Sequence, residues 1–207
     1  MNVLLKKWCL GVALSLSVSA AFPALAQTEK PDPVNYQVLE TQAETKVVTE
    51  YFSFYCPHCF QQNDFFKRVR NQLPDGVKFE RKHVSFMGGK MGIEVSKAYA
   101  YMVFIGREDE LVPKFFNLIH IDRNQPKSVT DIRAFFVENG VDGDDFDSIF
   151  DSFTIDTLAN EYDAALKRAG IRGVPAVVVN GQYHVTPNNI KSDDEYFELI
   201  DHLLEQN

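Results

Sequence analysis

Residues 46–55 (KVVTEYFSFY) form a nearly continuous run of β-branched and aromatic side chains. Such a run is too apolar for a strand with one face in water, and it predicts a strand in the centre of a sheet. The pattern changes to a helical period over 57–73, with Pro57 at the first helical position, where its missing N–H costs nothing. The expected core stripe of this helix is Phe60, Phe65, Phe66, Val69 and Leu73.

Shorter patterns predict further strands beside this central one. Polar and apolar residues alternate over 77–86, which indicates a second strand, and a short edge strand is expected over 36–39. Residues 173–185 (GVPAVVVNGQYHV) predict a buried strand, a type I′ turn at Asn180-Gly181 and a partner strand.

Helical patterns fill the segment between these strands and return at the end of the chain. Ser128 and Asp131 predict a helix cap, and Ser192 and Glu195 predict a capping box before the last helix. This order of elements predicts an α/β core interrupted by a helical insertion. The predicted helices span 93–105, 111–119, 129–139, one or two segments within 141–170, and 192–206.

The first 26 residues have the composition of a cleaved secretory signal peptide. Lys6 and Lys7 precede a run of apolar and small residues, and the sequence A-L-A ends at Ala26. The apolar run is shorter than the ~20 residues that a membrane span needs. Cleavage after Ala26 would leave 19 of the 21 basic residues against 29 acidic ones, a net charge of −10. This charge argues against a nucleic acid or an anionic membrane as partner.

Two cysteines, Cys56 and Cys59, lie outside this segment, and the third, Cys9, lies within it. A structural disulfide is one interpretation of the pair, but a bridge across so short a loop would constrain little of the unfolded chain. Zinc binding is another, but the sequence offers no second cysteine pair and no histidine pair at ligand spacing, so no metal is expected.

A redox centre agrees better with the predicted strand-to-helix junction. Cys56 would lie at the helix N-terminus, where unpaired N–H groups and the helix dipole favour an anion. Cys59, one turn further on, would be more buried, which assigns Cys56 as the nucleophile and Cys59 as the resolving thiol. Pro57 would set the helix start. His58 would lie close enough to stabilise the Cys56 thiolate, which makes the disulfide a stronger oxidant.

Three segments together resemble the DsbA family of periplasmic thiol:disulfide oxidoreductases. They are EYFSFYCPHCF (50–60), KHVSFMGG (82–89) and RGVPAVVVNGQY (172–183), and they follow the family's order over most of the chain. The resemblance implies a thioredoxin fold with an inserted helical domain. The implied parts are a signal peptide at 1–26, thioredoxin-like segments at 27–86 and 166–207, and the insertion at 87–165.

The resemblance also implies roles for residues outside the CPHC motif. Pro175 matches the family's cis-proline, which would lie against the disulfide and leave the Val174 backbone free to pair with an extended peptide. Phe86 and Met87 would line an apolar substrate groove or, alternatively, belong to the core.

Glu50 matches an acid that the family buries beneath the active site. A buried carboxylate needs a partner, and Arg81 on the neighbouring predicted strand could supply it. Two interpretations of Glu50 stay open, namely proton handling for Cys59 and a structural ion pair.

The function implied is that of a monomeric periplasmic oxidase of a Gram-negative bacterium, acting without a cofactor. It would donate its disulfide to exported proteins with free cysteines through a mixed disulfide at Cys56, and a membrane protein of the DsbB type would reoxidise it. A disulfide reductase or isomerase on the same fold and a peptide-binding chaperone are the alternatives.

Overall fold

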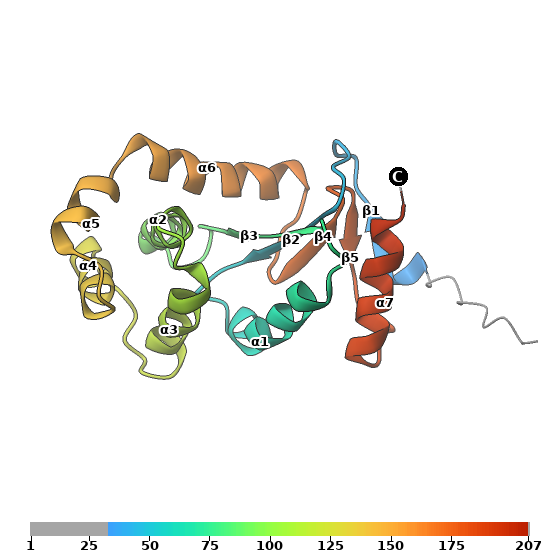
Figure 1. The fold of residues 1–207 in the computed structure, drawn as a ribbon, viewed down its shortest axis with the longest axis horizontal. Coiled ribbons are helices and arrows are strands. Elements are labelled where there is room, and N and C mark those ends of the chain that lie inside the picture. Colours follow the sequence, from blue (N-terminus) through green and yellow to red (C-terminus); the bar gives the residue numbers. More distant parts are fainter. Residues whose placement is uncertain (1–32, 207) are drawn as a thin grey trace, which may run out of the picture. The chain divides into compact units, whose positions relative to one another are not determined.

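A computed structural model describes residues 33–206, which fold around a five-stranded sheet (Figure 1). The strand order is β1-β5-β4-β2-β3, with β2 and β3 parallel and the other neighbours antiparallel. All six residues of β2 are buried, which confirms the predicted central strand. The predicted signal segment lies outside the described residues. The strands are β1 (Tyr36–Val38), β2 (Val47–Phe52), β3 (Lys78–His83), β4 (Ala176–Val179) and β5 (Tyr183–Val185).

Helices cover both faces of this sheet because both faces of β2 and β4 are apolar. On one face, α1 (Pro57–Gln72) and α7 (Asp193–Leu204) pack against the side chains of Val48, Val177 and Val179. On the other face, Ala165, Leu166 and Ala169 at the end of α6 pack against Tyr51, Ala176 and Val178 (Figure 1). The described part of the chain therefore has the layered α/β arrangement that the sequence predicts.

Five helices separate β3 from β4 in the chain, as the predicted helical insertion requires. The central α2 is largely buried and packs against α3, α4 and α6. The block has an aromatic core in which the Tyr101 ring meets those of Phe136 and Phe146 edge to face at 4.9 and 5.2 Å. The helices are α2 (Met91–Phe104), α3 (Glu108–His120), α4 (Val129–Glu138), α5 (Gly143–Ile149) and α6 (Phe153–Arg168).

The helix ends agree with the sequence in most places. Ser128 and Asp131 form a reciprocal capping box at α4. The box predicted at α7 is only half present: the Ser192 hydroxyl accepts from the Glu195 N–H, but the Glu195 carboxylate accepts from the Lys191 N–H at 2.8 Å. The acid reaches one residue further back than predicted, so the prediction of a full box was wrong.

The hairpin between β4 and β5 turns at Asn180 and Gly181, both with positive φ, as a type I′ turn requires. The buried Asn180 side chain also accepts from the Val47 N–H and donates to the carbonyls of Leu203 and Leu204. One turn residue thus ties β2 to the end of α7. Within residues 33–206, no helix has both the length and the apolar character that crossing a membrane requires.

Candidate active site

The two cysteines lie where β2 ends and α1 begins. Cys56 is the N-cap of α1, and its sulfur accepts the Cys59 N–H at 3.2 Å, the part usually played by a serine or aspartate oxygen. Both residues carry free thiols in the structure. The Cys56 residue is 3% exposed and Cys59 is 0% exposed. Cys56 is therefore the more accessible of the two cysteines.

Cys59 lies in an environment that disfavours its thiolate. Burial raises the pKa of the Cys59 thiol, and a hydrogen bond with Cys56 adds to that rise, while a hydrogen bond from the Ser53 backbone opposes it. The negative field of Glu50 is a further, smaller contribution in the same direction as burial. A sulfur released here as a leaving group would consequently take up a proton.

Pro57 and His58, the two residues between the cysteines, are both exposed. Pro57 occupies the first helical position, as predicted. The His58 ring makes no hydrogen bond within the described residues, so the structure does not contain a His58–Cys56 hydrogen bond. An effect of His58 on the cysteines would have to act through space, and it stays a prediction.

The Val174–Pro175 segment lies directly against the reactive sulfur. The Cys56 thiol donates to the Val174 carbonyl at 3.5 Å. The Val174–Pro175 peptide bond is cis, which confirms the predicted cis-proline. β4 begins at the next residue, Ala176, so the backbone beside the Cys56 sulfur leads directly into the sheet.

Glu50 and Arg81 are paired beneath the cysteines, in register on β2 and β3. The Arg81 guanidinium donates from Nε to one Glu50 oxygen at 2.8 Å and from a terminal nitrogen to the other at 3.2 Å. The Glu50 side chain is 0% exposed. Burial raises the pKa of the Glu50 carboxyl above its usual value, although the Arg81 charge acts against that rise. Arg81 also donates to the Asn63 side-chain oxygen at 3.3 Å, a contact that no sequence pattern predicts.

Phe86 and Met87 lie in the loop that leads from β3 into α2. Met87 packs against the apolar cluster that contains Cys56 and Cys59, whereas Phe86 is 54% exposed. Gly88, with φ at +85°, follows them, and a Cβ there would lie 2.2 Å from the Tyr55 ring. The loop can lie this close to the active-site segment because position 88 has no side chain.

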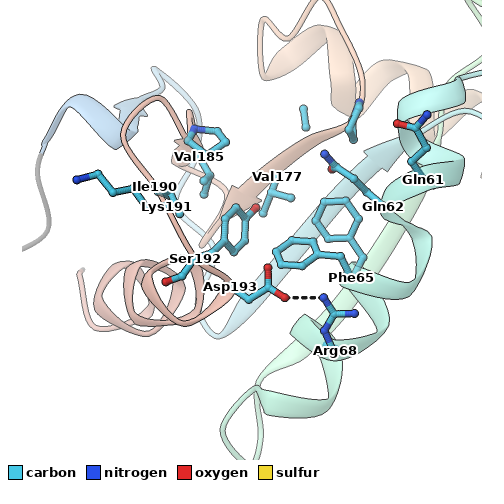
Figure 2. A pocket seen from close by; sticks show the side chains of 15 residues that line it. Gln61, Gln62, Phe65, Arg68, Val177, Val185, Ile190, Lys191, Ser192 and Asp193 are labelled. Carbon is cyan, nitrogen blue, oxygen red and sulfur yellow. Dashed lines mark hydrogen bonds and ion pairs between the residues drawn. The ribbon is translucent and has the colours of Figure 1, made fainter.

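A groove of about 490 Å³ runs away from Pro175 between α1 and α7. Figure 2 shows α1 side chains on one wall and Ile190 to Asp193 on the other, with an ion pair between Arg68 and Asp193 at 2.5 Å. Phe86 and Met87, expected from the family resemblance at a substrate groove or in the core, are not among its lining residues, and their role in substrate binding stays a prediction. Its lining includes Gln61, Gln62, Phe65, Arg68, Val177, Ile190, Asp193 and Tyr196.

The described residues contain no group of three or more histidine, cysteine or acidic side chains that could hold a metal.

Comparison with known proteins assigns the family. The model of the DSBA-like thioredoxin domain matches residues 47–194, from the start of β2 into α7. The chain belongs to the DsbA family. Its relatives include the thiol:disulfide interchange protein DsbA of Escherichia coli K12, with 32% identity over 95% of each chain. The DsbA protein of Haemophilus influenzae is also 32% identical, over 98% of this chain and all of that protein.

Solved structures of DsbA proteins have the same fold as this DsbA-family chain. DsbA of Proteus mirabilis is 34% identical with a TM-score of 0.72, covering 83% of this chain and 93% of that one. A cysteine-to-serine variant of the same protein, with a non-covalently bound peptide PWATCDS, gives a TM-score of 0.76 at 32% identity, covering 82% and 95%. The predicted thioredoxin fold with a helical insertion is confirmed, and the protein is a disulfide oxidoreductase.

Proposed function

We propose that this protein donates the Cys56–Cys59 disulfide to exported proteins while they fold. The observation that carries the proposal is the position of the Cys56 sulfur. It caps α1, accepts the Cys59 N–H and touches the Val174 carbonyl, and it is the less buried of the two thiols. The N-cap position and the Cys59 N–H favour negative charge on Cys56, and the full burial of Cys59 shields it from substrate.

The proposed reaction has two exchange steps. A substrate thiolate attacks the Cys56 sulfur, which breaks the Cys56–Cys59 bond and releases Cys59 as the leaving group. A second substrate thiolate then attacks the substrate sulfur of the mixed disulfide and releases Cys56. The substrate dithiol is oxidised by two electrons, and the protein is left as the dithiol.

Cys59 needs a proton when it leaves, because its burial disfavours the thiolate. Glu50 is the buried acid whose negative charge acts on the Cys59 thiol. Because its own pKa is raised, Glu50 can hold a proton more readily than an exposed glutamate and so could supply one to Cys59. The bidentate pairing with Arg81 supports the alternative, a purely structural ion pair.

The groove beside Pro175 is the proposed docking site for the substrate chain. In the Proteus mirabilis protein a peptide containing cysteine binds without a covalent bond. In this chain, a peptide extended along Val174 would place a cysteine next to the Cys56 sulfur and its neighbouring side chains in the groove. Phe65, Val177 and Ile190 give that groove an apolar lining, which favours a substrate with an apolar residue near its cysteine.

Replacing Ile190 with aspartate should weaken substrate docking without changing the thiol chemistry. We expect the KM for a two-cysteine peptide to rise by about five- to tenfold, because an apolar contact of roughly 1 kcal/mol is lost. Exchange with glutathione, which is too small to use the groove, should keep its wild-type rate. Phe153→Asp is the matched control, since Phe153 is 86% exposed and lies outside the groove. Equal KM values for the two variants would contradict this docking site.

The compartment, the reoxidant and the oligomeric state complete the proposal. The signal-like N-terminus and family membership support a periplasmic location in a Gram-negative bacterium. A dithiol product must be reoxidised before the next cycle, and a membrane protein of the DsbB type would accept its electrons. The protein would act as a monomer without a cofactor, because one chain provides both thiols and the groove.

The test mixes the oxidised mature protein with a reduced peptide that carries two cysteines. We expect the peptide to gain a disulfide while Cys56 and Cys59 become free thiols. Mass spectrometry after acid quenching measures both changes. A protein that exchanges no disulfide but still prevents aggregation of a client, also as the Cys56→Ser and Cys59→Ser double variant, would be a chaperone instead.

A further inference from the structure

Two histidines hold the backbone of Phe54, two residues before the reactive Cys56. The Phe54 N–H donates to His83 Nε2 at 3.0 Å, and the Phe54 carbonyl lies 2.8 Å from His120 Nε2. Phe54 is 0% exposed and lies beyond the end of β2, so neither group is part of the sheet. Side chains therefore satisfy the backbone N–H and C=O of Phe54, as neighbouring strands satisfy those of the residues in β2.

The chemistry of the partners fixes the form of each ring. An amide N–H can only donate, so His83 Nε2 must be an unprotonated acceptor. A carbonyl can only accept, so His120 Nε2 must carry a hydrogen. His83 is fully buried among aromatic rings, and this burial, with the nearby Arg81 charge, lowers its pKa to about 3. His83 consequently stays neutral and remains an acceptor at ordinary pH.

The two rings come from different parts of the fold and meet at the active-site segment. His83 is the last residue of β3, and His120 is the last residue of α3 in the helical block. The His120 ring also stacks on Phe60, the residue after Cys59, with ring centres 4.8 Å apart and an angle of 10°. His120 therefore contacts the chain on both sides of the CPHC motif.

Short backbone links connect the held peptide to both sulfurs. The Cys56 N–H donates to the Ser53 carbonyl at 3.0 Å, so Ser53 and Cys56 bracket Phe54 in one tight turn. The Ser53 backbone also makes the hydrogen bond that favours the thiolate of Cys59. A displacement of the Phe54 peptide would move Ser53 and so change the surroundings of both thiols.

We propose that His83 and His120 are positioning residues that hold the Phe54 peptide and thereby set the balance between dithiol and disulfide at Cys56 and Cys59. This inference rests on the proposed disulfide exchange and adds two residues that act on it without touching the substrate. The held peptide orients Cys56, whose sulfur accepts the Cys59 N–H at 3.2 Å, and such contacts favour the reduced form because a thiolate is a stronger hydrogen-bond acceptor than a disulfide sulfur. Their loss should shift the equilibrium toward the disulfide and make the protein a weaker oxidant.

His120 allows the hydrogen bond to be separated from the ring contact. His120→Phe keeps a ring to stack on Phe60 but removes the donor, whereas His120→Gln keeps a donor near the Nε2 position and removes the ring. We expect His120→Phe to shift the equilibrium constant with glutathione about fivefold toward the disulfide, the size of one lost hydrogen bond. His120→Gln should stay within about twofold of the wild type.

The matching pair at the other histidine is His83→Phe and His83→Gln. His83→Phe removes the acceptor for the Phe54 N–H and should shift the same equilibrium in the same direction, while His83→Gln retains an acceptor. Circular dichroism checks that each variant is folded. If the His83 variants do not fold, nitrogen-15 spectra of the wild type still test the arrangement, because they must show His83 Nε2 unprotonated and His120 Nε2 protonated.

The possible failures can be told apart. A wild-type protein that exchanges no disulfide would refute the proposed function itself. An active wild type with an unchanged equilibrium in His120→Phe would overturn only the positioning role. An equal shift in His120→Gln and His120→Phe would also overturn it, since ring packing rather than the hydrogen bond would then be responsible.

Discussion

Cys56→Ser is expected to abolish disulfide donation completely, because the only sulfur that a substrate can reach is then missing. Cys59 is 0% exposed and lies behind Cys56 in the first turn of α1, so it cannot replace the lost thiol. A serine hydroxyl forms no disulfide and is not ionised at neutral pH. Transfer to the two-cysteine peptide should fall to the level of the buffer.

Cys59→Ser should give the complementary result, a stable covalent complex. The remaining Cys56 can still exchange with a disulfide-containing peptide, but no neighbouring thiol resolves the mixed disulfide. Non-reducing electrophoresis and mass spectrometry should show the peptide attached at Cys56 alone. If Cys59→Ser forms no such complex while Cys56→Ser does, the roles assigned to the two cysteines are reversed.

Arg81→Met is expected to lower the free energy of unfolding by about 3–5 kcal/mol near neutral pH, because it leaves the Glu50 carboxylate buried without its partner. Glu50 is 0% exposed, and no described basic group other than Arg81 forms an ion pair with it. Urea denaturation of the reduced protein measures the loss. Arg68→Met is the matched control: its ion pair with Asp193 is about half exposed, and its loss should cost about 1 kcal/mol or less.

The destabilisation by Arg81→Met should depend on pH in a defined direction. Burial already raises the pKa of Glu50 above its reference value of 4.5, and removing the Arg81 charge raises it further. The folded state then binds a proton more readily than the unfolded state. Its stability therefore falls as the pH rises from the reference pKa of Glu50 to the raised pKa of the folded state. The deficit should thus be largest near neutrality and shrink as the pH falls toward 4.5. A deficit that is constant with pH, or equal to that of Arg68→Met, would contradict a charged, buried Glu50.

Sequence patterns predicted the framework well because they depend on local chemistry. The apolar run over 46–55 can lie only in the middle of a sheet, and the Asn180-Gly181 pair has few conformations other than a tight turn. Pro57 likewise marks the first turn of a helix. The same local logic placed Cys56 at the helix N-terminus and Cys59 inside it, as the structure shows.

The remainder of the site depends on residues that are distant in the chain. Arg68 on α1 and Asp193 on α7 close the groove together, but they are 125 positions apart and neither belongs to a motif. The family resemblance alone assigned Phe86 and Met87 to a substrate groove or to the core. Met87 packs against the cluster that contains the cysteines, and the groove role stays a prediction. The hydrogen bonds of His83 and His120 to the Phe54 backbone could not be predicted either, because no sequence pattern links these two histidines before the fold brings them together.

The central claim is that the Cys56–Cys59 pair donates its disulfide to substrate proteins. It is tested most directly by bringing the protein and a two-cysteine peptide to equilibrium from both directions, oxidised protein with reduced peptide and reduced protein with oxidised peptide. We predict that both mixtures end with the disulfide in the peptide and free thiols at Cys56 and Cys59. If both end instead with the disulfide in the protein, the protein acts as a reductase and the proposed donation of disulfides is wrong.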